Sequence, residues 1–283
     1  MNNIASIQQA LILAIRQLEV QQQRDARFEA ELLLAYLLQK PRVYLHTWPE
    51  RLLDPITVQR YDAVVKRRMA GEPIAYITGT KEFWSLELEV TAATLIPRPE
   101  TERLVELVVE RVPVTGRYCI ADLGTGSGAI ALAIATERPE CRVIATDLSR
   151  EALAVARRNA ARHQIHNIEF RESRWLSALA GEKLHLIAAN PPYIAPGDSH
   201  LTEGDLRFEP NSALVAGEEG MADLNHIARH AREYLFSGGW LVMEHGYDQR
   251  DKVSNLLTTL GYVNIQDHCD NAGQPRIVVG QFL

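Results

Sequence analysis

ADLGTGSGA, residues 121–129, is the stretch that decides the fold. An apolar run at 118–123 leads into the first glycine and a run rich in alanine follows the last, which predicts a strand, a tight turn and a helix. Glycine lets a ligand come close to the backbone, and the start of a helix offers N–H groups without partners. We therefore expect a ligand-binding loop formed by Gly124, Thr125, Gly126, Ser127 and Gly128.

The strand and helix patterns continue to alternate after this loop. We predict strands at 118–123, 141–146, 168–171, 184–189, 240–244, 262–267 and 276–282, and helices at 128–137, 150–163, 221–236 and 249–260. Such alternation indicates a parallel sheet with helices on both faces. No helix separates the last two strands, so one of them should run antiparallel. The predicted fold class is α/β, a Rossmann-like domain with a seven-stranded mixed sheet.

The first part of the chain has a different pattern. Residues 1–75 carry helical spacings only, and Asp54-Pro55 reads as the N-cap and first turn of the last long helix. We expect an N-terminal helical bundle over 1–75, followed by a linker and β-hairpin over 76–95. In that region residues 74–80 are expected to be a linker, and EFWSLELEV at 82–90 alternates like a strand or hairpin arm. The large domain should span 96–283, with a helix starting at Pro99.

The glycine spacing bears on the kind of ligand. A dinucleotide-binding loop would read G-x-G-x-x-G, whereas this one reads G-x-G-x-G after Asp122. A carboxylate there suits a cation, such as a sulfonium, better than a phosphate. Asp147 ends the second strand, where its carboxylate can accept hydrogen bonds from ribose hydroxyls. These features favour S-adenosylmethionine over a nicotinamide cofactor. The alternative is a plain glycine turn with Asp147 capping the next helix.

A second motif, Asn190-Pro191-Pro192-Tyr193, follows the fourth strand. The amide oxygen of Asn190 can accept a hydrogen bond from a substrate amino or amide group. The prolines fix the loop and offer carbonyls rather than N–H groups, and Tyr193 offers an aromatic face. Two acceptors on the hydrogens of a planar nitrogen would turn its lone pair toward a methyl donor. The plainer alternative is a tight turn after a strand.

Composition limits the other possibilities. The net charge is −6, unlike that of most proteins that hold duplex phosphates. The three cysteines form no C-x-x-C pair, and two of them lie in apolar strand-like runs, which favours reduced thiols in a cytoplasmic protein. His226 and His230 have the i, i+4 spacing of metal ligands but not the H-E-x-x-H pattern, and we expect no metal. We also expect no membrane segment.

Beyond these motifs, the sequence resembles one family over nearly its whole length. GEPIAYITG (71–79), EFWSLELEV, LIPRPETE (95–102), RFEP (207–210) and MEHG (243–246) are similar to segments of the protein-(glutamine-N5) methyltransferases of peptide chain release factors, the PrmC/HemK family of class I methyltransferases. The resemblance implies methyl transfer from S-adenosylmethionine, giving S-adenosylhomocysteine, to the glutamine of the Gly-Gly-Gln motif in class-1 release factors. It also implies that the N-terminal helices engage the release factor.

The resemblance implies residue roles as well. The loop 124–128, Asp147, Trp175 and Asn190 would contact the cofactor, Trp175 at the adenine. Residues 190–193 would contact the substrate, with Asn190 and Tyr193 catalytic. One departure is Arg174, where an acidic residue is frequent in the family. Because arginine cannot accept a hydrogen bond, Glu172 or a backbone carbonyl is expected to meet the adenine amino group instead.

Two other functions fit parts of the sequence. N-P-P-Y also serves nucleic-acid methyltransferases that act on exocyclic amines, adenine N6 or guanine N2. The acidic net charge and the short helical N-terminus argue against stable nucleic-acid binding. A non-catalytic binding module with the same fold is the other alternative, and the presence of both motifs argues against it. We expect a monomeric enzyme.

Overall fold

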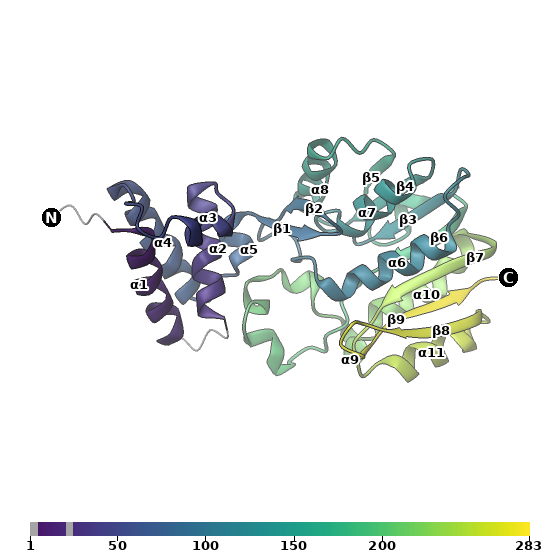
Figure 1. The fold of residues 1–283 in the computed structure, drawn as a ribbon. Helices are drawn as coiled ribbons and strands as arrows, with labels where there is room; N and C mark the ends of the chain where they lie inside the picture. The colour runs from purple at the N-terminus through teal and green to yellow at the C-terminus, as the bar shows by residue number, and fades with distance from the viewer. Residues whose placement is uncertain (1–4, 21–24) are drawn as a thin grey trace. The chain divides into compact units, whose positions relative to one another are not determined.

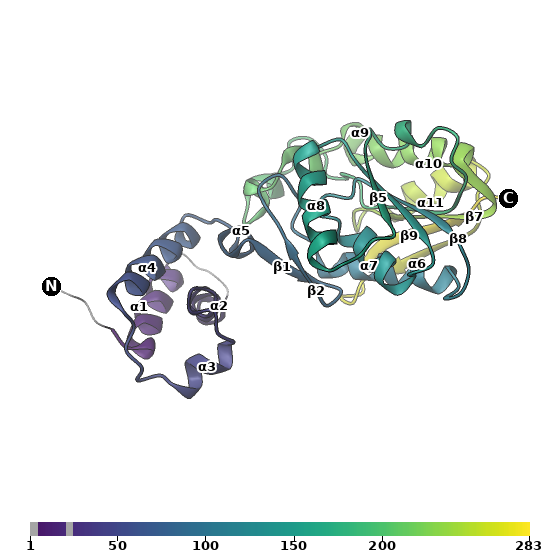
Figure 2. The same cartoon turned by 90° about the horizontal axis from the view of Figure 1, so that it is seen from above.

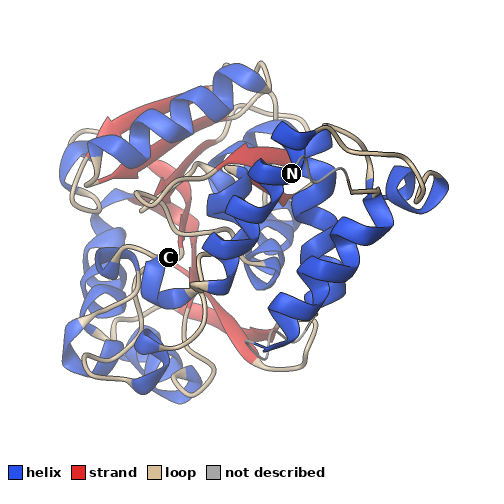
Figure 3. Cartoon of the chain, turned by 90° about the vertical axis from the view of Figure 1, so that its left-hand side faces the viewer, coloured by secondary structure: helices blue, strands red, loops and turns tan. Residues whose placement is uncertain are grey.

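The structure is a computed structural model that describes residues 5–20 and 25–283 (Figure 1). It divides into two compact units, Met1–Gly79 and Thr80–Leu283. All the strands drawn in Figure 3 belong to the second unit. Among the described residues, no helix combines the length and the apolar composition needed to cross a membrane.

The first unit is a bundle of helices, as expected, although residues 1–4 and 21–24 lie outside the described part. Its helices are α1 (Ile7–Val20), α2 (Ala26–Leu38), α3 (Arg42–Thr47), α4 (Pro55–Met69) and α5 (Ile74–Thr78). Asp54 caps α4, since its side chain accepts the backbone N–H of Thr57 at 3.0 Å and Pro55 opens the helix. Leu18, Leu33 and Val65 meet in a separate apolar core.

Two local expectations in the connecting region were wrong. Residues 74–80 are not an open linker: they contain α5, which starts after Pro73, ends at Gly79 and buries Ile77 in the bundle core. The β-hairpin expected within 76–95 is present as β1 (Thr80–Phe83) and β2 (Leu86–Glu89), but the segment 82–90 forms most of it and not one arm. Its turn residues Trp84 and Ser85 both have positive φ without being glycine or asparagine, so the usual hairpin signal is missing.

The second unit confirms the predicted mixed sheet of seven strands. They are β3 (Cys119–Leu123), β4 (Arg142–Asp147), β5 (Ile168–Glu172), β6 (Leu184–Ala189), β7 (Leu235–Glu244), β8 (Val263–Cys269) and β9 (Pro275–Gln281). Their order is β5-β4-β3-β6-β7-β9-β8, and β9 runs in the opposite direction to the other six strands. The chain order reverses between β3 and β6, which is where such sheets bind ligands.

Helices cover both faces of this sheet (Figure 2). The helices of this unit are α6 (Glu102–Arg111), α7 (Ala129–Glu137), α8 (Arg150–Arg162), α9 (Gly217–Gly220), α10 (Ala222–Tyr234) and α11 (Arg250–Thr259). One core joins the sheet to α6 and α7, and the other joins it to α10 and α11. The helix expected at 221–236 ends earlier, at Tyr234, because β7 begins directly at Leu235 without a loop.

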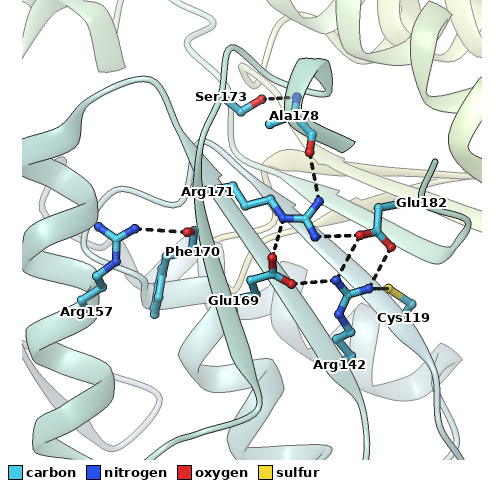
Figure 4. Close-up of polar contacts among 9 residues, drawn as sticks. All are labelled: Cys119, Arg142, Arg157, Glu169, Phe170, Arg171, Ser173, Ala178 and Glu182. Atoms are coloured by element: carbon cyan, nitrogen blue, oxygen red, sulfur yellow. Dashed lines mark hydrogen bonds and ion pairs between the residues drawn. The ribbon is translucent and has the colours of Figure 1, made fainter. Parts of the chain in front are cut away.

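Charged side chains link the outer parallel strands away from the carboxyl ends (Figure 4). Arg142, at the start of β4, pairs with Glu169 at 2.6 Å and with Glu182 at 2.8 Å. Arg171 joins the same two carboxylates at 2.8 and 2.7 Å. Single exposed pairs contribute little, but a network of shared partners holds its members in one geometry. This network ties β4 and β5 to the segment before β6.

Candidate functional site

A cavity of about 730 Å³ opens at the carboxyl ends of the central parallel strands. Its lining includes residues of every motif expected to bind the cofactor: Gly124, Gly126, Asp147, Trp175, Asn190 and Pro192. Several other lining residues had no role predicted from the sequence: Thr94, Leu95, Leu148, Ser149, Glu151, Ser212, Ala213 and Asp223. Of the residues expected at the site, Thr125, Ser127, Gly128 and Pro191 do not line this cavity, and Tyr193 lines its neighbours.

The glycine loop holds its shape through backbone bonds and close packing. The carbonyl of Thr146 accepts the N–H groups of Gly124 at 2.9 Å and of Thr125 at 2.8 Å. Gly128 has a φ of 90°, and a Cβ there would meet Ala156 of α8 at 3.2 Å. Gly126 has a φ of 56°, with open space where a Cβ would point. One glycine therefore allows the helix to pack, and the other leaves the cavity free.

Asp122 has a different role from the one expected. Its side chain is fully buried and accepts the Thr125 hydroxyl at 2.6 Å and the Ala131 N–H at 3.2 Å. Burial raises the pKa of Asp122 to about 7, and those two hydrogen bonds oppose the shift. The Asp122 carboxyl group thus stabilises the glycine loop through these hydrogen bonds and does not line the cavity.

Asp147 joins the loop to the second strand. Its Oδ2 accepts the N–H of Gly126 and its Oδ1 accepts the N–H of Ser149, both at 2.8 Å. Burial raises the pKa of Asp147, and these backbone donors oppose the shift. Ser149, not Asp147, is the N-cap of α8, so the alternative of a plain capping residue is wrong. Each carboxylate oxygen still has a lone pair for another donor.

Trp175 lies over the first glycine of the loop. A Cβ at Gly124 would stand 3.0 Å from the indole ring, so only glycine lets the ring pack this closely. The indole Nε1 donates to Asp223 of α10 at 3.0 Å, a contact that no sequence motif predicts. Arg174 and Glu172 both line the cavity, and Glu172 accepts from Arg150 at 2.5 Å.

Asn190 stands between two cavities. It lines the large one together with the glycine loop, and it lines a second cavity of about 140 Å³ together with Tyr193 and Glu244. Its side-chain Nδ2 donates to the hydroxyl of Thr101 at 3.2 Å. Tyr193 donates its hydroxyl to Glu244 at 3.2 Å. Burial raises the pKa of both Tyr193 and Glu244.

The LIPRPETE segment (95–102) and the RFEP motif (207–210) contact each other near Tyr193. The buried Glu209 carboxylate accepts the backbone N–H of Ile96 at 2.9 Å and pairs with the Arg98 guanidinium. Burial raises the pKa of Glu209, and the charge of Arg98 opposes the shift. A third cavity of about 480 Å³ is lined by Tyr193, Arg98 and Arg276, among others.

The histidine pair considered for metal binding lies outside these cavities. The rings of His226 and His230 are 4.3 Å apart, and His230 contacts the carbonyl of His226. Among the described residues there is no group of three or more His, Cys, Asp or Glu side chains that could hold a metal ion. The absence of a resident metal remains a prediction.

Sequence comparisons cover both units. The PrmC N-terminal domain model matches residues 9–79, and the methyltransferase small domain model matches residues 101–205. The chain is 49% identical over 278 residues to the release factor glutamine methyltransferase of Vibrio cholerae, covering 98% of this chain and 97% of the other. It is 46% identical over 279 residues to that of Aliivibrio fischeri, covering 98% of each.

A solved structure supports the fold. A methyltransferase from Pyrococcus furiosus aligns with a TM-score of 0.53 at 17% identity, over 78% of this chain and 96% of that one. Identity this low is informative about the fold alone. The full-length relatives are far closer, and on their similarity the chain belongs to the release factor glutamine methyltransferase family.

Proposed function

We propose that this protein transfers a methyl group from S-adenosylmethionine to the side-chain amide nitrogen, N5, of the glutamine in the Gly-Gly-Gln motif of class-1 peptide chain release factors. The family supports this reading, since relatives near one-half identity are release factor glutamine methyltransferases. The observation that carries it is the position of Asn190, which lines both the large cavity and the smaller one beside Tyr193.

The residues around the large cavity fit the cofactor. Its volume of about 730 Å³ lies within the range of roughly 300–1,000 Å³ usual for small-molecule sites. Asp147 has acceptor capacity left for ribose hydroxyls, Gly126 leaves room for a ligand at the backbone, and Trp175 offers an aromatic wall. S-adenosylmethionine, when bound, supplies a methyl group on a positively charged sulfur. The product is S-adenosylhomocysteine.

The chain's own residues act on the substrate nitrogen. An amide nitrogen is a weak nucleophile because its lone pair is delocalised into the carbonyl. The Asn190 oxygen and the Pro191 carbonyl accept its two hydrogens, which orients the lone pair toward the methyl carbon. The nitrogen would take the methyl group from the sulfonium, S-adenosylhomocysteine would leave as the neutral thioether, and water would accept the proton that the nitrogen loses. Tyr193 supports the planar amide from the side of the smaller cavity.

The two parts of the chain have separate tasks in this proposal. The helical bundle, expected over 1–75 and extended to Gly79 by α5, engages the body of the release factor. Residues 80–95 connect it to residues 96–283, which bind the cofactor and carry out the transfer. The enzyme acts as a monomer in the cytoplasm, without a metal and without stable nucleic-acid binding.

Mass spectrometry of methylated products tests the function. Purified enzyme and isotopically labelled S-adenosylmethionine are incubated with a class-1 release factor, with the same factor carrying asparagine in place of the motif glutamine, and with RNA and DNA. We expect one methyl group on the motif glutamine and none on the asparagine variant. Label on nucleic acid but not on the release factor would overturn the proposal. An enzyme that fails to bind the cofactor in calorimetry would support a non-catalytic binding module.

A further inference from the structure

We propose that Thr101 and Glu244 are positioning residues that fix the orientation of the Asn190 side-chain amide, so that its oxygen rather than its NH₂ group faces the substrate. The inference rests on the proposed function and extends it to two buried residues. Thr101 is 4% exposed and Glu244 is 1% exposed. They come from the start of α6 and the end of β7, far apart in the sequence.

The direction of each hydrogen bond around Glu244 determines which groups donate and which accept. The hydroxyl of Thr101 contacts Glu244 Oε2 at 2.7 Å, and the hydroxyl of Tyr193 contacts Glu244 Oε1 at 3.2 Å. Burial raises the pKa of Glu244, but the bonds from the two hydroxyls and the charge of Arg276 oppose that shift and favour the ionised form. An ionised carboxylate can only accept, so both hydroxyls donate to it. A threonine hydroxyl has a single hydrogen, and Thr101 uses it in the hydrogen bond that it donates to Glu244. The Thr101 oxygen can then act toward any other neighbour only as an acceptor.

That remaining neighbour is Asn190. Its terminal amide lies 3.2 Å from the Thr101 oxygen, and an acceptor there requires the NH₂ end. The two ends of an amide point in opposite directions, so the carbonyl end is left for the cavities that Asn190 lines. The substrate amide presents hydrogens, and only the oxygen of Asn190 can accept them. If the Asn190 amide were flipped, its NH₂ group would face the NH₂ group of the substrate amide, and two donors would meet.

Glu244 is well suited to this task because its carboxylate is buried and both of its oxygens are hydrogen-bonded. Its carboxylate is enclosed and uses one oxygen for each hydroxyl. Without it, the Thr101 hydrogen would be free to point at the Asn190 oxygen, and both amide orientations would become possible. The same carboxylate also fixes the Tyr193 hydroxyl, so one buried group orients the first and last residues of the N-P-P-Y motif.

The test compares steady-state turnover and cofactor binding in the full-length enzyme with release factor as substrate. Thr101→Val keeps the volume and removes the hydroxyl, and it should lower kcat by about tenfold, comparable to one lost hydrogen bond. The dissociation constant for S-adenosylmethionine should change by less than about threefold. Thr101→Ser, which restores the hydroxyl, should recover most of kcat. Thr136→Val is the matched control, since that hydroxyl bonds only a carbonyl of its own helix.

A double-mutant cycle separates positioning from a general structural effect. In an Asn190→Ala background, Thr101→Val should have no further effect on kcat, because the group that it orients is gone. Glu244→Met removes the acceptor of both hydroxyls, so in the wild-type background it should lower kcat at least as much as Thr101→Val does. Full additivity of Thr101→Val with Asn190→Ala, or wild-type turnover of either Thr101→Val or Glu244→Met, would overturn the proposal.

A readout without turnover comes from the side-chain NH₂ resonances of Asn190 in the cofactor-free protein. Thr101→Val should shift them and speed their exchange with water, whereas Thr136→Val should not. Unshifted resonances in Thr101→Val would also overturn the proposal. Failure of the proposed function itself is distinct, since the wild-type enzyme would then methylate no release factor while these resonances still responded.

Discussion

Asp147 accepts the backbone N–H of Gly126 at 2.8 Å, so the carboxylate that ends β4 also fixes the middle of the loop that follows β3. Asp147 therefore lines the cavity and also fixes the conformation of the glycine loop that lines it. Asp147→Ala should weaken S-adenosylmethionine binding by about 1.5–3 kcal/mol, the range for hydrogen bonds to a charged group. Isothermal calorimetry measures this directly. An unchanged dissociation constant would show that Asp147 does not hold the ribose.

Gly126 and Gly181 form a matched pair for testing the loop. Both have positive φ and open space where a Cβ would point, but only Gly126 lines the large cavity. Alanine at either position should lower the free energy of unfolding by about 1–2 kcal/mol, the cost of a left-handed alanine. Only Gly126→Ala should also weaken cofactor binding, by tenfold or more, because its methyl group enters the ligand's space. Equal affinities for the two variants would argue against close approach of the cofactor to the loop.

The buried Asp122 side chain should make the free energy of unfolding depend on pH. Burial raises the pKa of Asp122 to about 7 in the folded state, above the value of about 3.9 in an unfolded chain. The folded protein therefore retains a proton that the unfolded chain releases between these values. The contribution of Asp122 to the free energy of unfolding is full below the unfolded pKa and is lost as the pH rises through about 7.

Urea denaturation between pH 5 and pH 8 measures this contribution. Asp122→Asn keeps an oxygen for the Thr125 hydroxyl and the Ala131 N–H but cannot titrate. Its free energy of unfolding should fall less with rising pH than that of the wild type. Asp251→Asn, at an exposed position in α11, is the control and should follow the wild-type curve. Parallel curves for wild type and Asp122→Asn would contradict the assignment.

Asn190→Ala tests the acceptor at the junction of the cavities. Loss of a positioned polar group that acts on the reacting atoms commonly lowers kcat by about 10²–10³-fold. Affinity for S-adenosylmethionine should stay within a few-fold, because the main cofactor contacts lie elsewhere. Asn211→Ala, an exposed asparagine, is the control. An equal loss of cofactor binding and turnover in Asn190→Ala would mean that Asn190 serves the cofactor rather than the substrate.

The sheet and its two loops could be predicted because their signals are local. Apolar runs, glycine spacing and proline positions predict each element from its own residues, and the edge of a parallel sheet brings 124–128, Asp147 and Asn190 together. Local signals did not reveal the turn of the first hairpin, because Trp84 and Ser85 adopt positive φ there without being glycine or asparagine. Tertiary contacts stabilise that turn, including the bond from the Trp84 N–H to Glu102 at 2.9 Å.

The partners that complete the site could not be predicted for a related reason. Thr101 meets Glu244, Ile96 meets Glu209 and Trp175 meets Asp223, and each pair joins segments that are remote in the sequence. A buried polar residue has no periodic pattern that reveals its partner. The family resemblance includes LIPRPETE, RFEP and MEHG, but only the fold shows that Glu209 and Glu244 of the last two segments bond residues of the first.

Removal of the first unit tests the division of tasks between the domains. The apolar core of the bundle draws on residues between Ile7 and Ile77, and the two cores of the second unit draw on residues from Phe83 onward. A chain starting at Thr80 should therefore fold and bind S-adenosylmethionine within a few-fold of the full-length affinity. It should methylate a short Gly-Gly-Gln peptide as well as the full chain does, but intact release factor at least about tenfold less efficiently. The ratio of kcat/KM for factor and peptide is the measurement, because it cancels damage common to both substrates. A truncated enzyme with the full-length ratio would show that the bundle does not engage the release factor.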